Sequence, residues 1–388
     1  MARKPKVRKV RVDFRQNRQV RRRSDDWTRR YRADQEHLED AERRESVRAR
    51  GELSRKRTIL VDADGVPLVD EAQWQRGTVT RVHGLICTVC DQEGRVWRCT
   101  VRRVLRTLLI KSRSPVTVGD RVWFADVTQP GDVDLVGVIE RVEERSSKLS
   151  RRDQRRREHT IVANADQLLA VVSVAQPRLR PHLVDRYIVA ALKGNLRPVL
   201  CFNKMDLLTE LGDRTEEEER LPGQSVMDVI AEFRELGYQC VATSAVTGQG
   251  VEELREALRD HMTVLAGQSG VGKSSLLNAL QPGLNLKTRS VSDETEKGRH
   301  TTTWAELLRL DFGGFVVDTP GIRAFDLWNV APGELEAYFV EFVPYVPRCR
   351  FGDCTHRNEE GCAVRAAVEN GEISARRYYS YLKMFEEV

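Results

Sequence analysis

One short stretch constrains the fold of this chain more than any other. Residues 267–274 are GQSGVGKS and match G-x-x-x-x-G-K-[ST], the pattern of a phosphate-binding loop. An apolar run at residues 263–266 predicts a buried strand before the loop, and residues 275–280 predict the start of a helix after it. A strand, a glycine-rich loop and a helix in this order predict an α/β domain whose backbone N–H groups and helix N-terminus bind phosphate.

The residue types of this loop predict individual roles in binding a nucleoside triphosphate. We expect Lys273 to reach the β- and γ-phosphates and the Ser274 hydroxyl to bind Mg²⁺. The predicted phosphate-binding residues are Gly267, Gln268, Ser269, Gly270, Val271, Gly272, Lys273, Ser274 and Ser275.

Length and composition indicate a globular protein of two or three domains. The chain has 388 residues. No apolar run approaches the roughly 18 residues of a membrane span, and the N-terminus is charged rather than apolar. We therefore expect a cytoplasmic protein that does not bind membranes. Its eight cysteines are then expected to be thiols or metal ligands rather than disulfides.

The positive charge is concentrated at the N-terminus. Residues 1–57 hold 21 Lys and Arg against 10 Asp and Glu, whereas the rest of the chain holds 43 against 48. Residues 1–72 have few apolar side chains, which predicts a basic, disordered arm. Binding to RNA phosphate is our preferred interpretation, and a solubilising tail is the alternative.

Short strands punctuated by turns follow in residues 73–148. Strands are expected at residues 77–84, 85–90, 96–101, 118–124 and 136–142. Such a series predicts an OB-fold barrel that binds RNA with basic side chains on one face. The candidate side chains are Arg98, Arg102, Arg103 and Arg106. Cys87 and Cys90 should lie on opposite faces of one strand, as ordinary strand residues. Residues 150–157, rich in arginine, are expected to be a solvated linker or a second RNA contact.

Residues 158–330 alternate strands and helices, which predicts a parallel sheet covered by helices. An apolar strand at residues 198–202 ends in Asn203-Lys204-Met205-Asp206, the N-K-x-D pattern of guanine recognition. An Asp carboxylate can accept hydrogen bonds from N1–H and the exocyclic amine of guanine, a donor pair that adenine lacks. Asn203 is expected to bond the purine edge, and the Lys204 stem to lie against the base. A strand is expected at residues 239–245, and a backbone N–H at its end, Ser244-Ala245, is expected to meet the guanine O6.

Two further segments predict the switches of a GTPase. Residues 298–304, GRHTTTW, predict a first switch in which the Thr302 hydroxyl completes the Mg²⁺ shell. Residues 318–321, DTPG, match D-x-x-G. We expect Asp318 to hold Mg²⁺ through water and the Gly321 N–H to contact the γ-phosphate.

The last part, residues 331–388, contains a cysteine and histidine cluster. Cys349, Cys354, His356 and Cys362 have the chemistry of a closed, tetrahedral, structural Zn²⁺ site. A helix is expected at residues 374–387. Its Arg376, Arg377, Tyr378, Tyr379 and Tyr381 should pack on the cluster or face RNA.

The base-recognition residues precede the phosphate-binding loop, the reverse of the order in an ordinary small GTPase. With the barrel in front and the Cys/His cluster behind, this order resembles the RsgA family of circularly permuted GTPases. The resemblance extends from about Arg76 to the C-terminus, and residues 161–167, IVANADQ, also support it. It implies a monomeric enzyme that binds GTP and GDP, and it supports the same four zinc ligands.

The resemblance also implies a role in late maturation of the small ribosomal subunit, through rRNA contacts and subunit-stimulated GTP hydrolysis. Two alternatives remain open: an RNA-binding scaffold with GTP as a structural ligand, and a circularly permuted GTPase of large-subunit assembly. Ile322 follows D-x-x-G where many GTPases have a water-orienting glutamine. We therefore propose His300 as a catalytic residue beside Thr302, the alternative being that His300 only packs locally.

Overall fold

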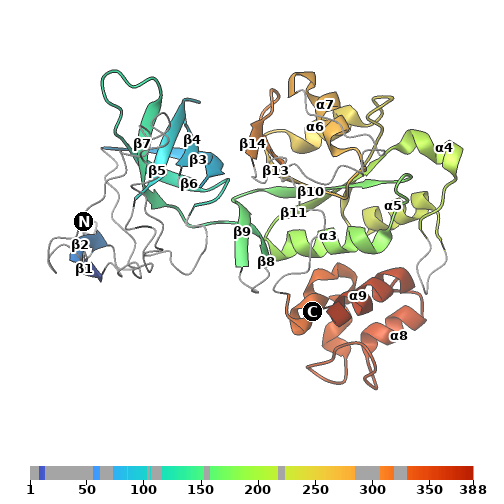
Figure 1. Ribbon diagram of the computed structural model, residues 1–388. Coiled ribbons are helices and arrows are strands. Elements are labelled where there is room, and N and C mark those ends of the chain that lie inside the picture. Colours follow the sequence, from blue (N-terminus) through green and yellow to red (C-terminus); the bar gives the residue numbers. More distant parts are fainter. Residues whose placement is uncertain are drawn as a thin grey trace, which may run out of the picture.

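The computed structural model describes residues 8–13, 56–61, 73–84, 86–102, 105, 116–152, 158–216, 223–284, 306–318 and 330–387 (Figure 1). Within the basic arm, β1 (Arg8–Asp13) and β2 (Lys56–Val61) form an antiparallel ribbon. Composition predicts disorder there, but residues 9–12 alternate basic residues with valine, a period-2 pattern that suits a strand.

A closed barrel follows the arm. It consists of β3 (Trp74–His83), β4 (Ile86–Asp91), β5 (Val96–Val101), β6 (Arg121–Asp126) and β7 (Leu135–Val142). The strand order is β3-β4-β5-β7-β6, and β6 closes the barrel by pairing with β3. Since β5 and β7 run parallel and all other neighbours antiparallel, the topology is OB-like, as predicted.

Two details of the barrel can be compared with the sequence prediction. Cys87 is buried and Cys90 is half-buried, which confirms that they lie on opposite faces of β4. The strand predicted from residue 118 begins instead at Arg121. Asp120 is fully buried, and its carboxylate accepts hydrogen bonds from the Thr117 N–H and from Arg145, so this stretch forms a turn.

A β-hairpin joins the barrel to the next domain. It pairs β8 (Lys148–Arg152) with β9 (Glu158–Ala163) in antiparallel register. The sequence predicted a solvated linker or an RNA contact at residues 150–157; residues 150–152 belong to a paired strand of the joining hairpin, and residues 153–157 lie outside the described part. Pairing of the two strands supplies hydrogen-bond partners for the backbone N–H and C=O groups here. The arginine-rich composition gave no indication of this pairing.

The central α/β domain is built on one twisted sheet. Its strand order is β12 (Gln239–Thr243), β11 (Arg197–Asn203), β10 (Gln167–Ser173), β13 (Met262–Ala266), β15 (Phe315–Asp318) and β14 (Glu306–Arg309). All neighbours are parallel except β14, which runs antiparallel to β15 and also touches β3 of the barrel through the Glu306–Arg81 pair.

Helices cover both faces of this sheet. Figure 1 shows α3 (Pro181–Lys193) and α5 (Val226–Glu235) below it, and α6 (Val251–Leu258) and α7 (Lys273–Leu280) above it. The short elements are η2 (Met205–Leu207), α4 (Leu208–Leu211) and η3 (Pro282–Leu284). Among the described helices, none combines the length and the apolar character that crossing a bilayer requires.

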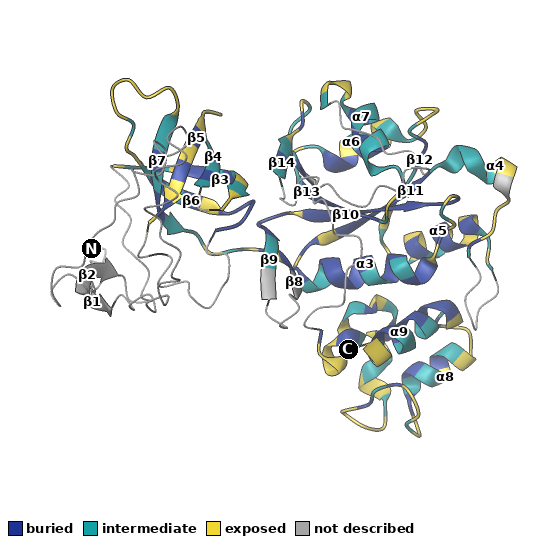
Figure 2. Ribbon diagram, in the orientation of Figure 1, coloured by how far each residue is buried: buried dark blue, intermediate teal, exposed yellow. Residues whose placement is uncertain are grey.

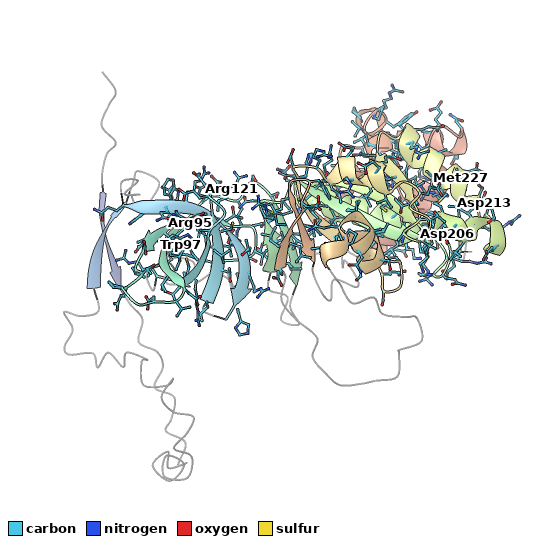
Figure 3. The ribbon with its side chains drawn as sticks, turned by 90° about the horizontal axis from the view of Figure 1, so that it is seen from above. Arg95, Trp97, Arg121, Asp206, Asp213 and Met227 are labelled. Atoms are coloured by element: carbon cyan, nitrogen blue, oxygen red, sulfur yellow. The ribbon has the colours of Figure 1, made fainter. Side chains whose placement is uncertain are left out.

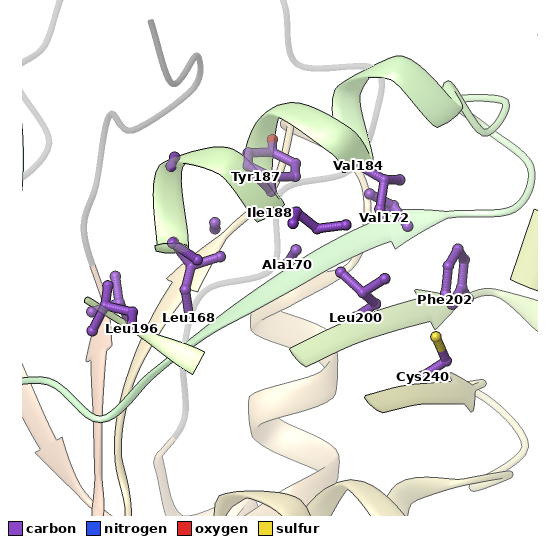
Figure 4. Packing of buried hydrophobic residues seen from close by; sticks show 14 of the residues in the cluster. Leu168, Ala170, Val172, Val184, Tyr187, Ile188, Leu196, Leu200, Phe202 and Cys240 are labelled. Atoms are coloured by element: carbon purple, nitrogen blue, oxygen red, sulfur yellow. The ribbon is translucent and has the colours of Figure 1, made fainter. Parts of the chain in front are cut away.

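Burial follows this layered arrangement (Figure 2). Every residue of β10 is buried, as expected for a parallel strand covered on both faces. On one face Leu168 and Ala170 pack against Tyr187 and Ile188 of α3, which Figure 4 shows from close by. The opposite face packs against α6 and α7 in a second apolar layer.

The C-terminal domain lies under α3 (Figure 1). It contains η4 (Pro332–Tyr338), η5 (Val340–Phe342), η6 (Val346–Arg348), α8 (Ala363–Glu369) and α9 (Ala375–Glu387). Two of the α9 tyrosines pack on the Cys/His cluster: the Tyr378 and Tyr381 hydroxyls donate to the carbonyls of His356 and Thr355.

The α9 arginines do neither of the things predicted for them. Arg376 and Arg377 are buried at the junction with the central domain, where both donate to the Asp185 carboxylate of α3. Their positive charges are therefore paired with a carboxylate inside the protein rather than exposed on its surface.

Candidate functional site

Three loops that carry predicted site residues meet at one edge of the central sheet. The loop at 267–272 follows β13, Asn203 ends β11 with residues 204–206 directly after it, and residues 244–245 follow β12. Because these strands are parallel, their carboxyl ends lie at the same edge, which is where α/β proteins bind ligands. The fold therefore brings together residues that are far apart in the sequence.

Glycine is required at two points of the phosphate-binding loop. Gly267 has φ of 147°, and a Cβ there would lie 2.3 Å from the Val171 carbonyl oxygen. Gly272 has φ of 94°, and a Cβ there would lie 2.4 Å from the Asn203 side-chain nitrogen. Buried Val271 anchors the loop in the apolar layer below α7. Any side chain at either glycine would push this loop away from its neighbours.

Lys273 begins α7 directly after the loop. Its ammonium donates to the carbonyl oxygens of Gly267 and Gln268 at 2.7 and 2.8 Å. The charge is thus held over the loop whose backbone N–H groups would surround phosphate, at the N-terminal end of a helix.

Asn203 links the end of β11 to this loop. Its Nδ2 donates to the Val271 carbonyl oxygen at 2.8 Å, and its Oδ1 accepts from the Thr243 hydroxyl at 3.2 Å. The Cys201 thiol lies 3.2 Å from the same hydroxyl, so the polar chain is continuous. Both ends of the buried amide are bonded to protein groups, and it holds the two loops in register.

Asp206 has a buried carboxylate oxygen, Oδ1, without a hydrogen-bond partner in the described part of the chain. An unpaired buried acceptor is costly, so such an atom commonly marks a ligand site. Figure 3 shows Asp206 in the central domain, far from the barrel residues Arg95 and Trp97. Neighbouring Lys204 has left-handed backbone with φ of 68° and donates to the Gln176 carbonyl oxygen at 2.6 Å. Burial lowers the pKa of Lys204.

The turn after β12 is fixed by Ser244. Its buried hydroxyl accepts from the N–H groups of Val246 and Thr247, and its own N–H donates to the Gln249 carbonyl oxygen. Ala245 follows, half-buried, within this rigid turn.

The predicted switches lie largely outside the described residues. His300, Thr302 and Gly321 are not described, so their roles stay predictions. Asp318 is the last residue of β15, the strand next to β13. Its backbone therefore lies at the same sheet edge as the end of the phosphate-loop strand.

The four predicted metal ligands form a cluster in the C-terminal domain. Their ligand atoms, from Cys349, Cys354, His356 and Cys362, all lie within 4.8 Å of one another. His356 is fully buried, and its Nδ1 lies 3.6 and 3.4 Å from the sulfurs of Cys349 and Cys362. Three thiols and one imidazole at this spacing are compatible with a tetrahedral zinc site.

Sequence reasoning missed several residues that support these sites. Thr243 was identifiable only by its place before Ser244, and Cys201 lies in an apolar strand with nothing to single it out. Glu336, which contacts His356, had no signal in the sequence, because it lies in a short helix outside any motif.

Comparisons with known proteins identify the family. The model of the RsgA GTPase family matches residues 142–328. A small ribosomal subunit biogenesis GTPase RsgA from Thermotoga petrophila is 41% identical over 315 residues, covering 81% of this chain and 97% of the relative. One from Sodalis glossinidius is 37% identical over 350 residues, covering 89% and 94%. The chain belongs to the RsgA family.

Solved structures of the RsgA family extend the comparison to the fold. The crystal structure of YjeQ from Thermotoga maritima matches with a TM-score of 0.61 and 39% identity, covering 81% of this chain and 98% of that one. The structure of YloQ, described as a circularly permuted GTPase, matches with a TM-score of 0.58 and 28% identity, covering 82% and 96%. The predicted fold class is thereby confirmed, and membership in the RsgA family makes this chain a GTP-hydrolysing enzyme.

Proposed function

We propose that this chain is a cytoplasmic GTPase that binds the small ribosomal subunit and assists its late maturation, with hydrolysis stimulated by the subunit. The observation that carries the proposal is the similarity to relatives named small ribosomal subunit biogenesis GTPase, which extends over almost their whole length. The geometry of the base site adds independent support for the nucleotide.

Guanine would be selected by Asp206. The buried, unpaired Oδ1 would accept from a guanine donor, which would remove the cost of leaving that oxygen without a partner. Because the Ser244 N–H is already bonded to Gln249, the Ala245 N–H is the better donor to the guanine O6. Asn203 would act by holding the two loops together rather than by touching the purine.

The phosphates would lie in the loop at 267–272, with Lys273 and Ser274 at the start of α7. Ser274, Thr302 and Asp318 would hold Mg²⁺, which neutralises charge on the β- and γ-phosphates when it is bound. The Gly321 N–H would contact the γ-phosphate. Lys273 supports this arrangement, since its ammonium is already directed over the loop by two carbonyl oxygens.

Hydrolysis would be slow in the isolated protein. Ile322 cannot orient the attacking water, so we propose that the subunit orders the first switch and brings His300 against it. Thr302 would complete the same arrangement through the metal ion.

Contacts to rRNA would come from basic surfaces outside the α/β domain. Arg98 is exposed on the outer face of β5, and Arg102 is exposed at its end, where it pairs with Glu140. The basic arm, residues 1–72, would add contacts to phosphate that weaken as salt rises. We propose a monomer with one structural Zn²⁺ held by Cys349, Cys354, His356 and Cys362.

The test is GTP turnover by the full chain, measured alone and with purified small or large ribosomal subunits. Stimulation by the small subunit only is expected. Stimulation by the large subunit instead would support a role in large-subunit assembly. No turnover with either subunit, despite tight GTP binding, would support a scaffold that uses GTP as a structural ligand.

A further inference from the structure

The two ring nitrogens of His356 face different partners. Nδ1 lies 3.4 Å from the Cys362 sulfur and 3.6 Å from the Cys349 sulfur, inside the metal cluster. Nε2 lies 2.5 Å from a carboxylate oxygen of Glu336, outside the cluster. One nitrogen is therefore placed to bind metal and the other to donate a hydrogen bond to a carboxylate.

The ring is held in this orientation from several sides. The Phe342 ring meets the imidazole edge-on at 6.0 Å between centroids, and the Tyr381 ring lies 6.1 Å away. The backbone on either side is held as well, since the Tyr378 and Tyr381 hydroxyls donate to the carbonyl oxygens of His356 and Thr355. With no exposed surface, the imidazole is confined between its sulfur and carboxylate partners.

Glu336 lies in a segment that also contacts the α/β domain. It belongs to η4, the short helix that precedes the cluster. Glu334 of the same helix pairs with Lys193 at the end of α3, at 2.5 Å. The helix η4 thus has one carboxylate on the α/β domain and another on the metal-binding histidine.

We propose that Glu336 is the positioning carboxylate of the metal site. It fixes the His356 proton on Nε2 and leaves Nδ1 free to bind the metal. This inference rests on the zinc site proposed above.

The physical reason is the chemistry of neutral imidazole. A neutral ring carries one N–H and one lone pair, and the hydrogen bond to one nitrogen decides which nitrogen is the ligand. A carboxylate partner also makes the ligating nitrogen more basic, and loss of such a partner typically weakens metal binding by about 10- to 100-fold. The Glu336 side chain is 28% exposed, so its charge is only partly screened by water.

The test is zinc affinity of the full chain, measured by competition with a chromophoric chelator. Glu336→Ala should weaken Zn²⁺ binding by about 10- to 100-fold. Glu336→Gln keeps a neutral acceptor for the Nε2–H and should lose less. Glu334→Gln is the matched control, since its carboxylate lies on the same helix but pairs with Lys193. Its zinc affinity should stay within about twofold of wild type. A change that small is well below the loss of affinity expected when a carboxylate partner of the histidine is removed.

A second measurement reports the tautomer directly. In zinc-loaded wild type with ¹⁵N-labelled histidine, His356 should show a protonated Nε2 and a metal-bound Nδ1 in long-range ¹H–¹⁵N spectra. The GTP affinity of each variant checks that its α/β domain is folded. If Glu336→Ala does not fold, Glu336→Gln takes its place in the test.

The outcomes separate this inference from the zinc proposal. If Cys354→Ser loses zinc while both Glu336 variants bind it like wild type, or if Nε2 is the metal-bound nitrogen, the role of Glu336 is refuted and the zinc site stands. If Cys354→Ser keeps its full zinc content, the ligand set itself is wrong.

Discussion

Asp185 is the residue whose loss should most weaken the junction between the α/β and C-terminal domains. Its fully buried carboxylate accepts from the Arg377 guanidinium at 2.6 Å and from that of Arg376 at 3.0 Å. Glu341 pairs with Arg377, and Glu232 pairs with Arg376. Two arginines of α9 thus meet three carboxylates, one each from α3, α5 and η5, at this junction.

The size of the effect follows from what Asp185→Ala leaves behind. Each guanidinium keeps one carboxylate but loses a charge-assisted hydrogen bond in a buried site. Breaking such a buried network typically costs about 3–5 kcal/mol. Since about 1.4 kcal/mol is a factor of ten, the open form of the C-terminal domain should become about 100- to 4,000-fold more populated.

Amide hydrogen exchange of α9 measures that opening under native conditions. Exchange should accelerate by the same factor in Asp185→Ala. The control is Glu387→Gln, because Glu387 pairs with Arg186 across the same two helices but is 40% exposed. That variant should change stability by less than about 1 kcal/mol. Unchanged α9 exchange in Asp185→Ala would refute the idea that the buried ion cluster holds the domains together.

The cluster also predicts a pH dependence. Burial by itself would raise the pKa of Asp185, but the guanidiniums of Arg376 and Arg377 outweigh burial and lower it. A carboxyl group with a lowered folded-state pKa stabilises the fold above its unfolded pKa of about 4, and this stability is lost as the pH falls further. Protection of the α9 amides against hydrogen exchange should therefore decrease below about pH 4 in wild type. The decrease should be smaller in Asp185→Asn.

Four further predictions concern the individual sites. Asp206→Asn should shift preference from GTP toward xanthosine triphosphate, because an amide cannot accept from both guanine donors; an unchanged affinity ratio would contradict guanine recognition by this residue. Cys354→Ser should lower the zinc content from about one ion per chain and loosen the C-terminal domain while GTP still binds; full zinc by elemental analysis would exclude it as a ligand. Deleting residues 1–57 should weaken subunit binding and flatten its salt dependence without changing intrinsic turnover, since it removes a net charge of +11; identical salt slopes would leave the arm a solubilising tail. His300→Ala should lower subunit-stimulated turnover by about 100-fold with little change in GTP or subunit affinity. Stimulated turnover within about twofold of wild type would be a far smaller loss than removal of a catalytic acid or base causes, and would show that the catalytic group lies elsewhere.

The sequence by itself determined the elements that local patterns encode. The phosphate-binding loop, the strand ending in Asn203 and the alternating strands of the barrel all depend on residues close in sequence, whose periodicity or glycine content limits the backbone. The Cys/His cluster was predictable for a similar reason, because its four residues lie within fourteen positions, at 349–362. The permuted order of the motifs was also visible in the sequence.

Only the tertiary structure decided how these parts support one another. Asn203 bonds Val271 across 68 residues, and Arg377 bonds Asp185 across 192, distances over which no local pattern carries information. An arginine in an amphipathic helix has the same sequence signature whether it faces RNA or a buried aspartate. What separates the two is whether folding places a carboxylate opposite it, because a guanidinium is stable away from water only when it is paired. The same reasoning applies to Glu336, whose role depends on η4 placing its carboxylate against a histidine twenty residues further along the chain.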